Sequence, residues 1–543
     1  MGFFDKLSAI KNTFNAMAKP VYTAEMGAES YNQYGNGREF GILFGQSTGQ
    51  LSANGDTNGI YANQLIWLKK QELCMNTIVF GGIGAGKTTR FMQPMLQQVM
   101  CYDDVGGLIF DIKSDFTKAV DLYAHLVNRD VIHIGISDTS RGINLIKGLT
   151  PEQVSSYLMS AIGLTGGVGN DPFWSQAGID LCRNTLTYLS YIDKYKEDEK
   201  CYTLGEMYNY IFSKVSQAGR NEQIAEIMEE LEEKADNDDK DAETDLRILE
   251  TTKSYFENIY GGMDIKMQQS VRSVITPILQ PFVNPAIIDA FSNDGTEEKP
   301  AYDLRGVTAG DIVVVDLPLS KWGIGGKVIY TIIKLRFFNY LQERQFDKTK
   351  PQNLCMFMCD EYQEIISASK GNAGLDDKSF WDKSRSSGCF GIISTQSVNA
   401  LKSTIGNDEI TKTILANFRQ KICFRTEDSD TIKFFSEPLG KVEKVRVTGS
   451  NGGSMRNNYY LNTNDLPTMN YNQQTQIIDK DIVDASLIHN LDGEHALALL
   501  NLDGSGAEDV LIMPAYFDDG GGNSFFINTI LNGLSNGKII CEM

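Results

Sequence analysis

Residues 77–88 read Thr-Ile-Val-Phe-Gly-Gly-Ile-Gly-Ala-Gly-Lys-Thr, an apolar run followed by a glycine-rich segment. The first four residues are mostly β-branched or aromatic, which is typical of a buried strand. The next eight match the phosphate-binding pattern G-x-x-x-x-G-K-[ST]. The segment from Thr89 to Met92 is then expected to open a helix. A strand, a glycine-rich loop and a helix in this order predict a P-loop protein that binds a nucleoside triphosphate.

The loop residues have separate expected roles. Glycines allow the backbone to turn its N–H groups toward phosphates and to approach them closely. We expect Lys87 to reach the β- and γ-phosphates and Thr88 to ligate Mg²⁺, while the positive end of the following helix faces the phosphates. The residues expected to bind the nucleotide are Gly81, Gly82, Ile83, Gly84, Ala85, Gly86, Lys87, Thr88 and Thr89.

The composition indicates an ordinary globular protein. The 543 residues suffice for two or three domains, with 42% hydrophobic and 22% charged residues. The net charge of −20 and the pI near 4.8 argue against an outer surface that coats nucleic acid. They leave open a small basic patch or pore, because ten acidic residues are concentrated in 229–245.

The sequence also predicts a cellular location. The nine cysteines contain no CxxC pair, so neither a zinc site nor a disulfide framework is expected. No apolar run is long enough for a membrane-spanning helix, and no signal peptide is recognisable. We therefore expect a cytoplasmic protein.

Residues 1–20 predict a short amphipathic helix. Phe3, Leu7, Ile10 and Phe14 lie near helical spacing, with lysines elsewhere on the helical wheel. Such a helix can lie at a membrane surface, dock on a partner or pack on the chain's own body. Peripheral attachment to the inner face of the cell membrane is therefore one possibility.

Further along, apolar strand-like runs alternate with helical stretches. Strands are predicted at 107–111, 131–134 and 312–316, and such alternation is typical of a mostly parallel α/β sheet. Residues 150–300 show helical periodicity and few strand signals. We therefore predict a RecA-like P-loop domain formed by 21–150 and 300–543, with an all-α domain inserted at 150–300. The Gly-, Asn- and Ser-rich segment 448–458 predicts a flexible surface loop.

A second motif lies far downstream. Residues 354–359 form an apolar run that ends in Asp360 and Glu361. Beside a phosphate-binding loop, Asp360 is expected to hold the Mg²⁺ shell. Glu361 is expected to act as the general base that polarises the attacking water.

A third strand, 390–395, ends at Gln396. This amide would lie at the carboxyl edge of the sheet and could sense the γ-phosphate, or simply cap a turn. Arg385 lies near the end of a predicted helix and could act on a neighbouring subunit's nucleotide, or be a plain surface arginine. Arg425 is a second candidate for this trans-acting role.

Several segments together resemble a known family. Besides the two phosphate motifs, they are Asp111 to Asp115, Asp171 to Trp174, Arg385 to Gly388, Thr395 to Ser397, Ile414 to Phe418 and Ser436 to Gly440. Their order is similar to that in the coupling-protein ATPases of conjugation and type IV secretion, relatives of the chromosome-pumping DNA translocases. The resemblance covers roughly residues 70–515.

The resemblance implies a hexameric ring that uses ATP and Mg²⁺ to pump DNA, or to escort a protein–DNA substrate, toward a secretion channel. It further implies that the all-α insertion recognises relaxosome or cargo proteins. Two features depart from the family. Asp-Ile-Lys-Ser at 111–114 replaces Asp-Pro-Lys-Gly, and the usual N-terminal pair of membrane-spanning helices is absent. The segment 1–20 or a separate membrane partner could replace the anchor.

No nucleic-acid-binding motif is visible. The candidate pore contacts are Lys266, Arg272, Lys412, Arg419 and Lys421, although each is more readily explained as a solvated or ion-paired charge. The absence of an Asn/Thr-Lys-x-Asp motif favours ATP over GTP. Two other functions stay open: a genome-packaging or defence ATPase on the same fold, and a nucleotide-gated recruiter of secreted proteins that does not thread DNA.

Overall fold

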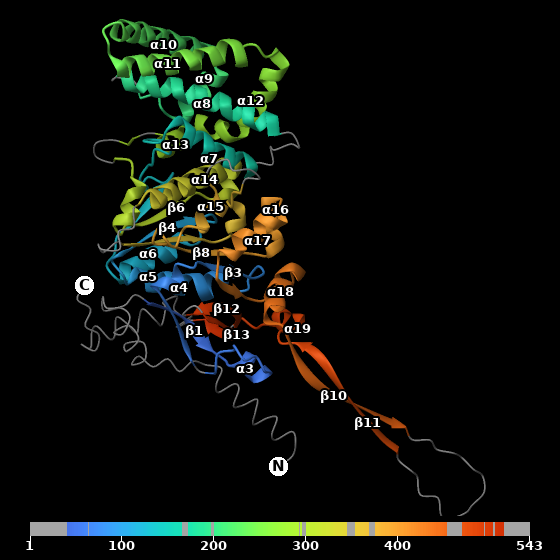
Figure 1. Cartoon of the computed structure of the whole chain (residues 1–543). Helices are drawn as coiled ribbons and strands as arrows, with labels where there is room; N and C mark the ends of the chain where they lie inside the picture. Colours follow the sequence, from blue (N-terminus) through green and yellow to red (C-terminus); the bar gives the residue numbers. More distant parts are fainter. Residues whose placement is uncertain are drawn as a thin grey trace, which may run out of the picture.

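The computed structural model describes residues 41–62, 64–164, 172–196, 200–292, 294–295, 300–344, 353–368, 375–452, 470–493, 495–502 and 505–514. The predicted amphipathic helix at 1–20 and Asp171 lie outside the described residues. Figure 1 shows a central sheet with helices packed around it, a further stack of helices at the top of the view, and a long hairpin that extends away from the sheet.

The described residues form one large sheet of eleven strands, in the order β2-β1-β13-β12-β9-β3-β8-β7-β4-β6-β5. The strands from β9 to β5 run parallel to one another. They are β9 (Gln420–Cys423), β3 (Thr77–Phe80), β8 (Cys389–Thr395), β7 (Leu354–Cys359), β4 (Val105–Asp111), β6 (Ile312–Asp316) and β5 (Val131–Gly135). The prediction of a mostly parallel sheet with a RecA-like P-loop fold is therefore confirmed.

Antiparallel strands extend the sheet beyond β9. They are β12 (Ala496–Leu502), β13 (Ser505–Pro514), β1 (Gly41–Ser47) and β2 (Leu65–Lys69). Within this extension Ser47 is opposite Ile512, so a strand from the beginning of the described chain pairs with one from its end.

Helices cover both faces of the sheet because alternate strand residues are buried on opposite sides. Ile109 and Met358 lie in one apolar cluster with residues of α5 (Gln93–Met100) and α6 (Thr117–Leu126). Phe110 and Phe357 lie in the other cluster. The helices on that second face include α14 (Leu319–Glu343), α15 (Asp377–Trp381), α16 (Val398–Ile405), α17 (Asp408–Ala416) and α18 (Ser429–Ser436).

Between β5 and β6 the described chain is almost entirely helical. The helices are α7 (Pro151–Leu164), α8 (Pro172–Tyr195), α9 (Leu204–Phe212), α10 (Lys214–Ala235), α11 (Lys240–Ser254), α12 (Ile265–Leu279) and α13 (Pro285–Phe291). We refer to α7–α13 as the helical region. It rests on α14 through α7 and α12, and α10 and α11 lie at its outer end (Figure 1). Because α14 also packs on the sheet, it contacts both the sheet and the helical region.

Short elements complete the described chain. They are α3 (Gln50–Asn54), α4 (Lys70–Leu73), α19 (Ala485–His489) and the 3₁₀ or π turns η1 (Thr88–Met92), η2 (Tyr255–Tyr260), η3 (Gln280–Val283), η4 (Leu304–Ala309), η5 (Tyr362–Glu364) and η6 (Glu437–Leu439). The helix predicted after the phosphate-binding loop thus begins with a π turn before α5.

The hairpin of β10 (Lys441–Gly452) and β11 (Asn470–Asp481) corrects one prediction. Residues 448–452, expected in a flexible loop, continue β10 and pair with β11 from Thr448 opposite Gln474 to Gly452 opposite Asn470. Their Gly- and Asn-rich composition suggested a loop, but the ladder hydrogen bonds to β11 determine their conformation. The rest of the predicted loop, 453–458, lies outside the described residues.

Within the described part of the chain, no single helix is long and apolar enough to cross a membrane. One pair of segments, Ile265–Val283 and Pro285–Phe291, passes on length and composition together, but it is bent by 83°.

Candidate nucleotide-hydrolysis site

The phosphate-binding loop connects β3 to η1 and has the backbone that its sequence requires. Gly84 and Gly86 have φ angles of 72° and 96°, in the left-handed region that glycine adopts without steric penalty. The N–H of Gly82 donates to the carbonyl of Arg425 at 2.9 Å, which fixes the start of the loop on the segment after β9. The start of the loop is therefore anchored at the carboxyl ends of the neighbouring parallel strands β3 and β9.

Lys87 and Thr88 lie at the end of this loop. The buried ammonium of Lys87 donates to the carbonyls of Gly81 and Gly82 at 2.8 and 3.3 Å. Burial lowers the pKa of Lys87, although the nearby carboxylates of Glu361 and Asp360 oppose this shift. The cation therefore lies in the loop with both acidic residues of the second motif close by.

Asp360 connects the two motifs. Its Oδ2 accepts a hydrogen bond from Thr88 Oγ1 at 2.7 Å, across 272 residues of sequence. Its Oδ1 accepts from the hydroxyl of Ser394, in the intervening strand β8, and from the backbone N–H of Glu361 at 2.9 Å. A hydroxyl and a carboxylate side by side are oxygen ligands of the kind that Mg²⁺ takes, so these residues fit a magnesium ion.

Glu361 follows β7 in an unusual conformation. Its φ angle is 52°, which non-glycine residues rarely adopt. Its side chain is only 7% exposed, and its Oε1 forms an ion pair with Lys113 Nζ at 2.6 Å. Its Oε2 accepts from Gln363 Nε2 at 2.5 Å. The carboxylate is thereby held at the edge of the sheet beside the phosphate-binding loop.

These contacts set the charge of Glu361. Burial alone would raise its pKa, but the hydrogen bonds from Lys113 and Gln363 and the charges of Lys113 and Lys87 lower it below the usual value. Glu361 is therefore a carboxylate at neutral pH, as a general base must be.

Lys113 was not among the predicted site residues. It lies in the segment that departs from the family pattern, between Asp111 and Ser114. Asp111 caps this turn, because its Oδ2 accepts from the N–H groups of Phe116 and Thr117 at 2.9 and 2.7 Å. Ser114 has a φ angle of 59° in the position of the family's glycine. The replacement therefore leaves the turn formed, and Lys113 reaches the site.

Gln396 lies where the sequence predicted. Thr395 is opposite Phe80 in the parallel pair of β8 and β3, so Gln396 and Gly81 leave neighbouring strands at the same level. Its side chain is partly exposed and makes no hydrogen bond among the described residues. Gln396 is therefore beside the loop and free to contact a ligand.

The two arginine candidates lie at opposite edges of the sheet. The carbonyl of Arg425 contacts Gly82, so this exposed residue is beside its own phosphate-binding loop. Arg385 instead lies in the turns between α15 and β8, because α15 ends at Trp381. The neighbouring Ser384 accepts a hydrogen bond from Asn76, just before β3. Arg385 is thus at the amino edge, about 20 Å along β8 from its own site.

The candidate pore contacts have different surroundings. Lys266, Lys412 and Arg419 are exposed. Arg272 donates to the hydroxyl of Tyr260 at 2.7 Å. Lys421, in β9, faces the ring of Phe434 in α18. Burial lowers the pKa of Lys421 to about 8, so this residue fits a pore contact poorly.

Comparisons with known proteins support the resemblance noted from the motifs. A family model described as "TraM recognition site of TraD and TraG" matches residues 355–493, which include Asp360, Glu361, Arg385 and Gln396. A search of curated proteins by sequence finds no match.

Solved structures match over most of the chain. The bacterial conjugative coupling protein TrwBdeltaN70 in its unbound form aligns with a TM-score of 0.56 at 15% identity, covering 87% of this chain and 94% of that one. The resemblance to conjugative coupling proteins is confirmed. TrwB in complex with ADP and Mg²⁺ aligns with a TM-score of 0.55 at 14% identity, covering 88% and 95%. At such identities the match establishes the fold of coupling proteins for this chain.

Proposed function

We propose that this protein is an ATP-driven DNA-translocating motor of the type IV secretion coupling-protein type. The observation that carries the proposal is the contact of Thr88 with Asp360, which joins the phosphate-binding loop to the acidic pair 272 residues away. The carboxylate of Glu361 and the amide of Gln396 lie at the same edge of the sheet. The fold shared with TrwB, which has been solved with ADP and Mg²⁺, supports the choice of nucleotide and metal.

In this proposal each residue has one task. Lys87 leaves the carbonyls of Gly81 and Gly82 to bind the β- and γ-phosphates, while the loop N–H groups bind the remaining phosphate oxygens. Thr88 and Asp360 would hold Mg²⁺, which neutralises phosphate charge when bound. Gln396 would contact the γ-phosphate or the attacking water.

Glu361 accepts the proton of the attacking water. The water oxygen forms a bond to the γ-phosphorus, the bond from phosphorus to the bridging oxygen breaks, and ADP and phosphate leave. Each carboxylate oxygen has two acceptor positions. Glu361 can therefore keep its contacts to Lys113 and Gln363 while it accepts from water.

The proposed assembly is a hexameric ring in which Arg385 acts on the next subunit's nucleotide. Its place at the amino edge of the sheet, opposite its own loop, supports a role in trans rather than in cis. The family match over 355–493 supports relaxosome proteins as partners, and a membrane partner or the segment 1–20 would bring the ring to a secretion channel.

The first test is steady-state ATP hydrolysis with and without single- and double-stranded DNA, over a range of protein concentrations. A motor predicts a rate that DNA stimulates and that rises faster than linearly with protein, and Lys87→Ala should abolish it. A hydrolysis rate that DNA does not change at low salt would contradict DNA translocation. It would favour a nucleotide-gated recruiter of proteins.

A mixing experiment tests the trans role of Arg385. Arg385→Ala and Lys87→Ala are each expected to be inactive alone. Mixed rings contain interfaces that combine an intact phosphate-binding loop with an intact Arg385, so the mixture should regain activity. A mixture as inactive as its components would contradict the role in trans.

A further inference from the structure

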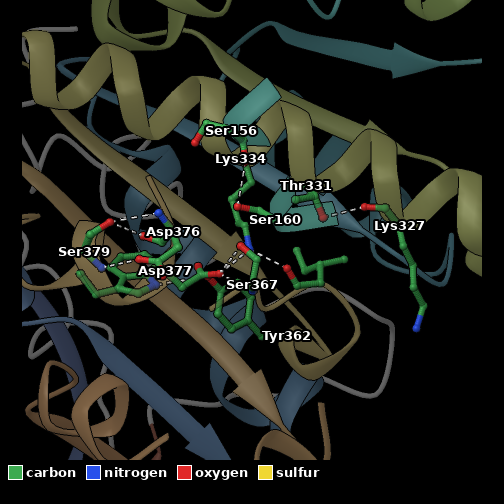
Figure 2. Close-up of polar contacts among 12 residues, drawn as sticks. Ser156, Ser160, Lys327, Thr331, Lys334, Tyr362, Ser367, Asp376, Asp377 and Ser379 are labelled. Atoms are coloured by element: carbon green, nitrogen blue, oxygen red, sulfur yellow. Dashed lines mark hydrogen bonds and ion pairs between the residues drawn. The ribbon is translucent and has the colours of Figure 1, made fainter. Parts of the chain in front are cut away.

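A fully buried ion pair lies next to the turn that follows Glu361. Lys334, from the middle of α14, and Asp377, at the start of α15, are both 0% exposed, and their Nζ and Oδ2 atoms are 2.6 Å apart. Figure 2 shows Lys334 reaching from α14 toward Asp377, with Tyr362 and Ser367 around the same carboxylate. A charged pair in an apolar interior is rarely a source of net stability, so another role should be sought.

In the described part of the chain, the hydrogen-bond partners of these two charged groups belong to the turn that follows Glu361. Asp377 accepts hydrogen bonds from the hydroxyl of Tyr362 and from the N–H and hydroxyl of Ser367, the last two at 2.6 and 3.0 Å. Lys334 also donates to the carbonyl of Ile365 at 2.5 Å. The pair thus holds the segment 362–367 at three of its residues, Tyr362, Ile365 and Ser367.

This segment determines where Glu361 points. The left-handed φ angle of 52° at Glu361 is unfavourable for a non-glycine residue and persists only when the surrounding structure enforces it. On one side, β7 fixes Glu361 through Cys359, opposite Ile393. On the other side, the attachment is Tyr362, which is fully buried and whose hydroxyl also accepts from Trp381 Nε1 at 3.2 Å.

Tyr362 is suited to a permanent attachment. Its side chain is fully buried and its hydroxyl donates to the Asp377 carboxylate, so this attachment is shielded from solvent. Its ring also lies 5.2 Å from Lys334 Nζ.

We infer that Lys334, Asp377 and Tyr362 are positioning residues that fix the conformation of Glu361 for water activation. The inference rests on the proposed hydrolysis of ATP. The three residues are fully buried, so they would act on Glu361 through the backbone of 361–367. The same pair joins α14, on which the helical region rests, to α15, which leads to Arg385. The base and the trans-acting arginine therefore share one internal support.

The test uses the full-length protein and Tyr362→Phe, which removes one hydroxyl and preserves the packing. The matched control is Tyr210→Phe, because Tyr210 is equally buried in α9 and its hydroxyl donates to Asn221 at 2.7 Å, remote from the site. A second variant, Lys334→Met with Asp377→Asn, removes both charges together, so neither charge is left unpaired. The measurements are kcat and KM for ATP, the Kd of a fluorescent ATP analogue, and Tm.

Small misplacements of reacting groups can reduce rates by about 100-fold, so we expect Tyr362→Phe to lower kcat about tenfold. Its analogue Kd should stay within about twofold, and the double variant should follow the same pattern, because positioning affects the chemical step and not binding. Tyr210→Phe should keep the kcat of the unmodified protein.

Three results would overturn the inference: an unchanged kcat in Tyr362→Phe, an equal loss in Tyr210→Phe, or a parallel loss of nucleotide binding, which would indicate general structural damage. Absence of hydrolysis by the unmodified protein would instead refute the proposed function, so the two failures are distinguishable.

Discussion

Replacing Lys113 by Met tests the electrostatics of the site most directly. In the unmodified protein Lys113 Nζ lies 2.6 Å from Glu361 Oε1 and opposes the effect of burial on that carboxyl group. Methionine keeps most of the side-chain volume but removes the charge and the donor. The buried carboxylate then keeps Gln363 and the more distant Lys87 as its remaining stabilising neighbours.

The magnitude follows from the geometry. A hydrogen bond to a charged group contributes about 1.5–3 kcal/mol. Because the Lys113 side chain is 48% exposed, solvent screening reduces this to about 1–1.5 kcal/mol. Since a tenfold change in ionisation corresponds to about 1.4 kcal/mol, the acidic limb of the rate profile should move up by about one pH unit.

The direction of the pH effect follows from the direction in which the pKa of Glu361 is shifted. The pKa of Glu361 is lowered in the folded protein, so its contribution to stability is present above the unfolded pKa and lost as the pH falls through the folded pKa. In Lys113→Met the effect of burial is less opposed, so the pKa rises. Activity and this part of the stability should then be lost at a higher pH.

The assay is kcat for ATP hydrolysis from about pH 3.5 to pH 8, with KM measured at each pH, so that the range includes the acidic limb of the unmodified protein. Lys113→Arg should keep the unmodified profile because it keeps the charge. Lys147→Met is the matched control, since it removes a surface ion pair with Asp294 at 2.8 Å, away from the site. If Lys113→Met and Lys147→Met have the same acidic limb, Lys113 does not set the ionisation of Glu361.

Three further predictions concern single residues. Glu361→Gln should bind an ATP analogue normally but hydrolyse ATP about 100- to 10,000-fold more slowly, and equal rates in a steady-state assay would exclude it as general base. Phe357→Ala should lower the free energy of unfolding by about 3–5 kcal/mol in a urea titration, because Phe357 is fully buried against Phe110 and Trp381. Burial lowers the pKa of Lys421 to about 8, and no carboxylate in the described part of the chain pairs with it. Above about pH 8 the folded protein therefore loses this proton while the unfolded chain still holds it. The free energy of unfolding should then rise with pH up to about 10. Lys421→Met should flatten this rise and add about 1–2 kcal/mol at pH 7, because the side chain is only partly buried, and a destabilised variant would contradict the assignment.

The parts of the site that are local in sequence could be predicted. The strand before Gly81 and the strand before Asp360 are apolar runs, and the roles of the residues that follow come from patterns with a chemical reason. The place of Gln396 at the carboxyl edge of the sheet also followed from the general rule that parallel strands share this edge. These inferences needed no knowledge of which strands are neighbours.

The parts that depend on strand order could not be predicted. Lys113 contacts Glu361 because β4 lies next to β7, and nothing in either segment specifies that neighbour. A sequence signal did exist, because Lys113 comes just after an apolar strand. However, Ser114 replaces the glycine of the similar family, so by sequence this segment indicates only a departure from the family pattern. Lys334 gave no signal, because a lysine in a long helix is normally exposed. Its burial depends on a carboxylate 43 residues away.

The antiparallel extension of the sheet has a consequence for how the chain acquires its structure during synthesis. Ser47 is synthesised long before its partner Ile512. At about 5–20 residues per second, β1 and β2 wait for tens of seconds with a hydrogen-bonding edge uncovered. The phosphate-binding strand β3 faces a similar delay, because its neighbours β8 and β9 also follow late. Until β13 is made, the uncovered edge of β1 favours aggregation of the nascent chain. A chaperone that shields strand edges would therefore raise the yield of folded protein.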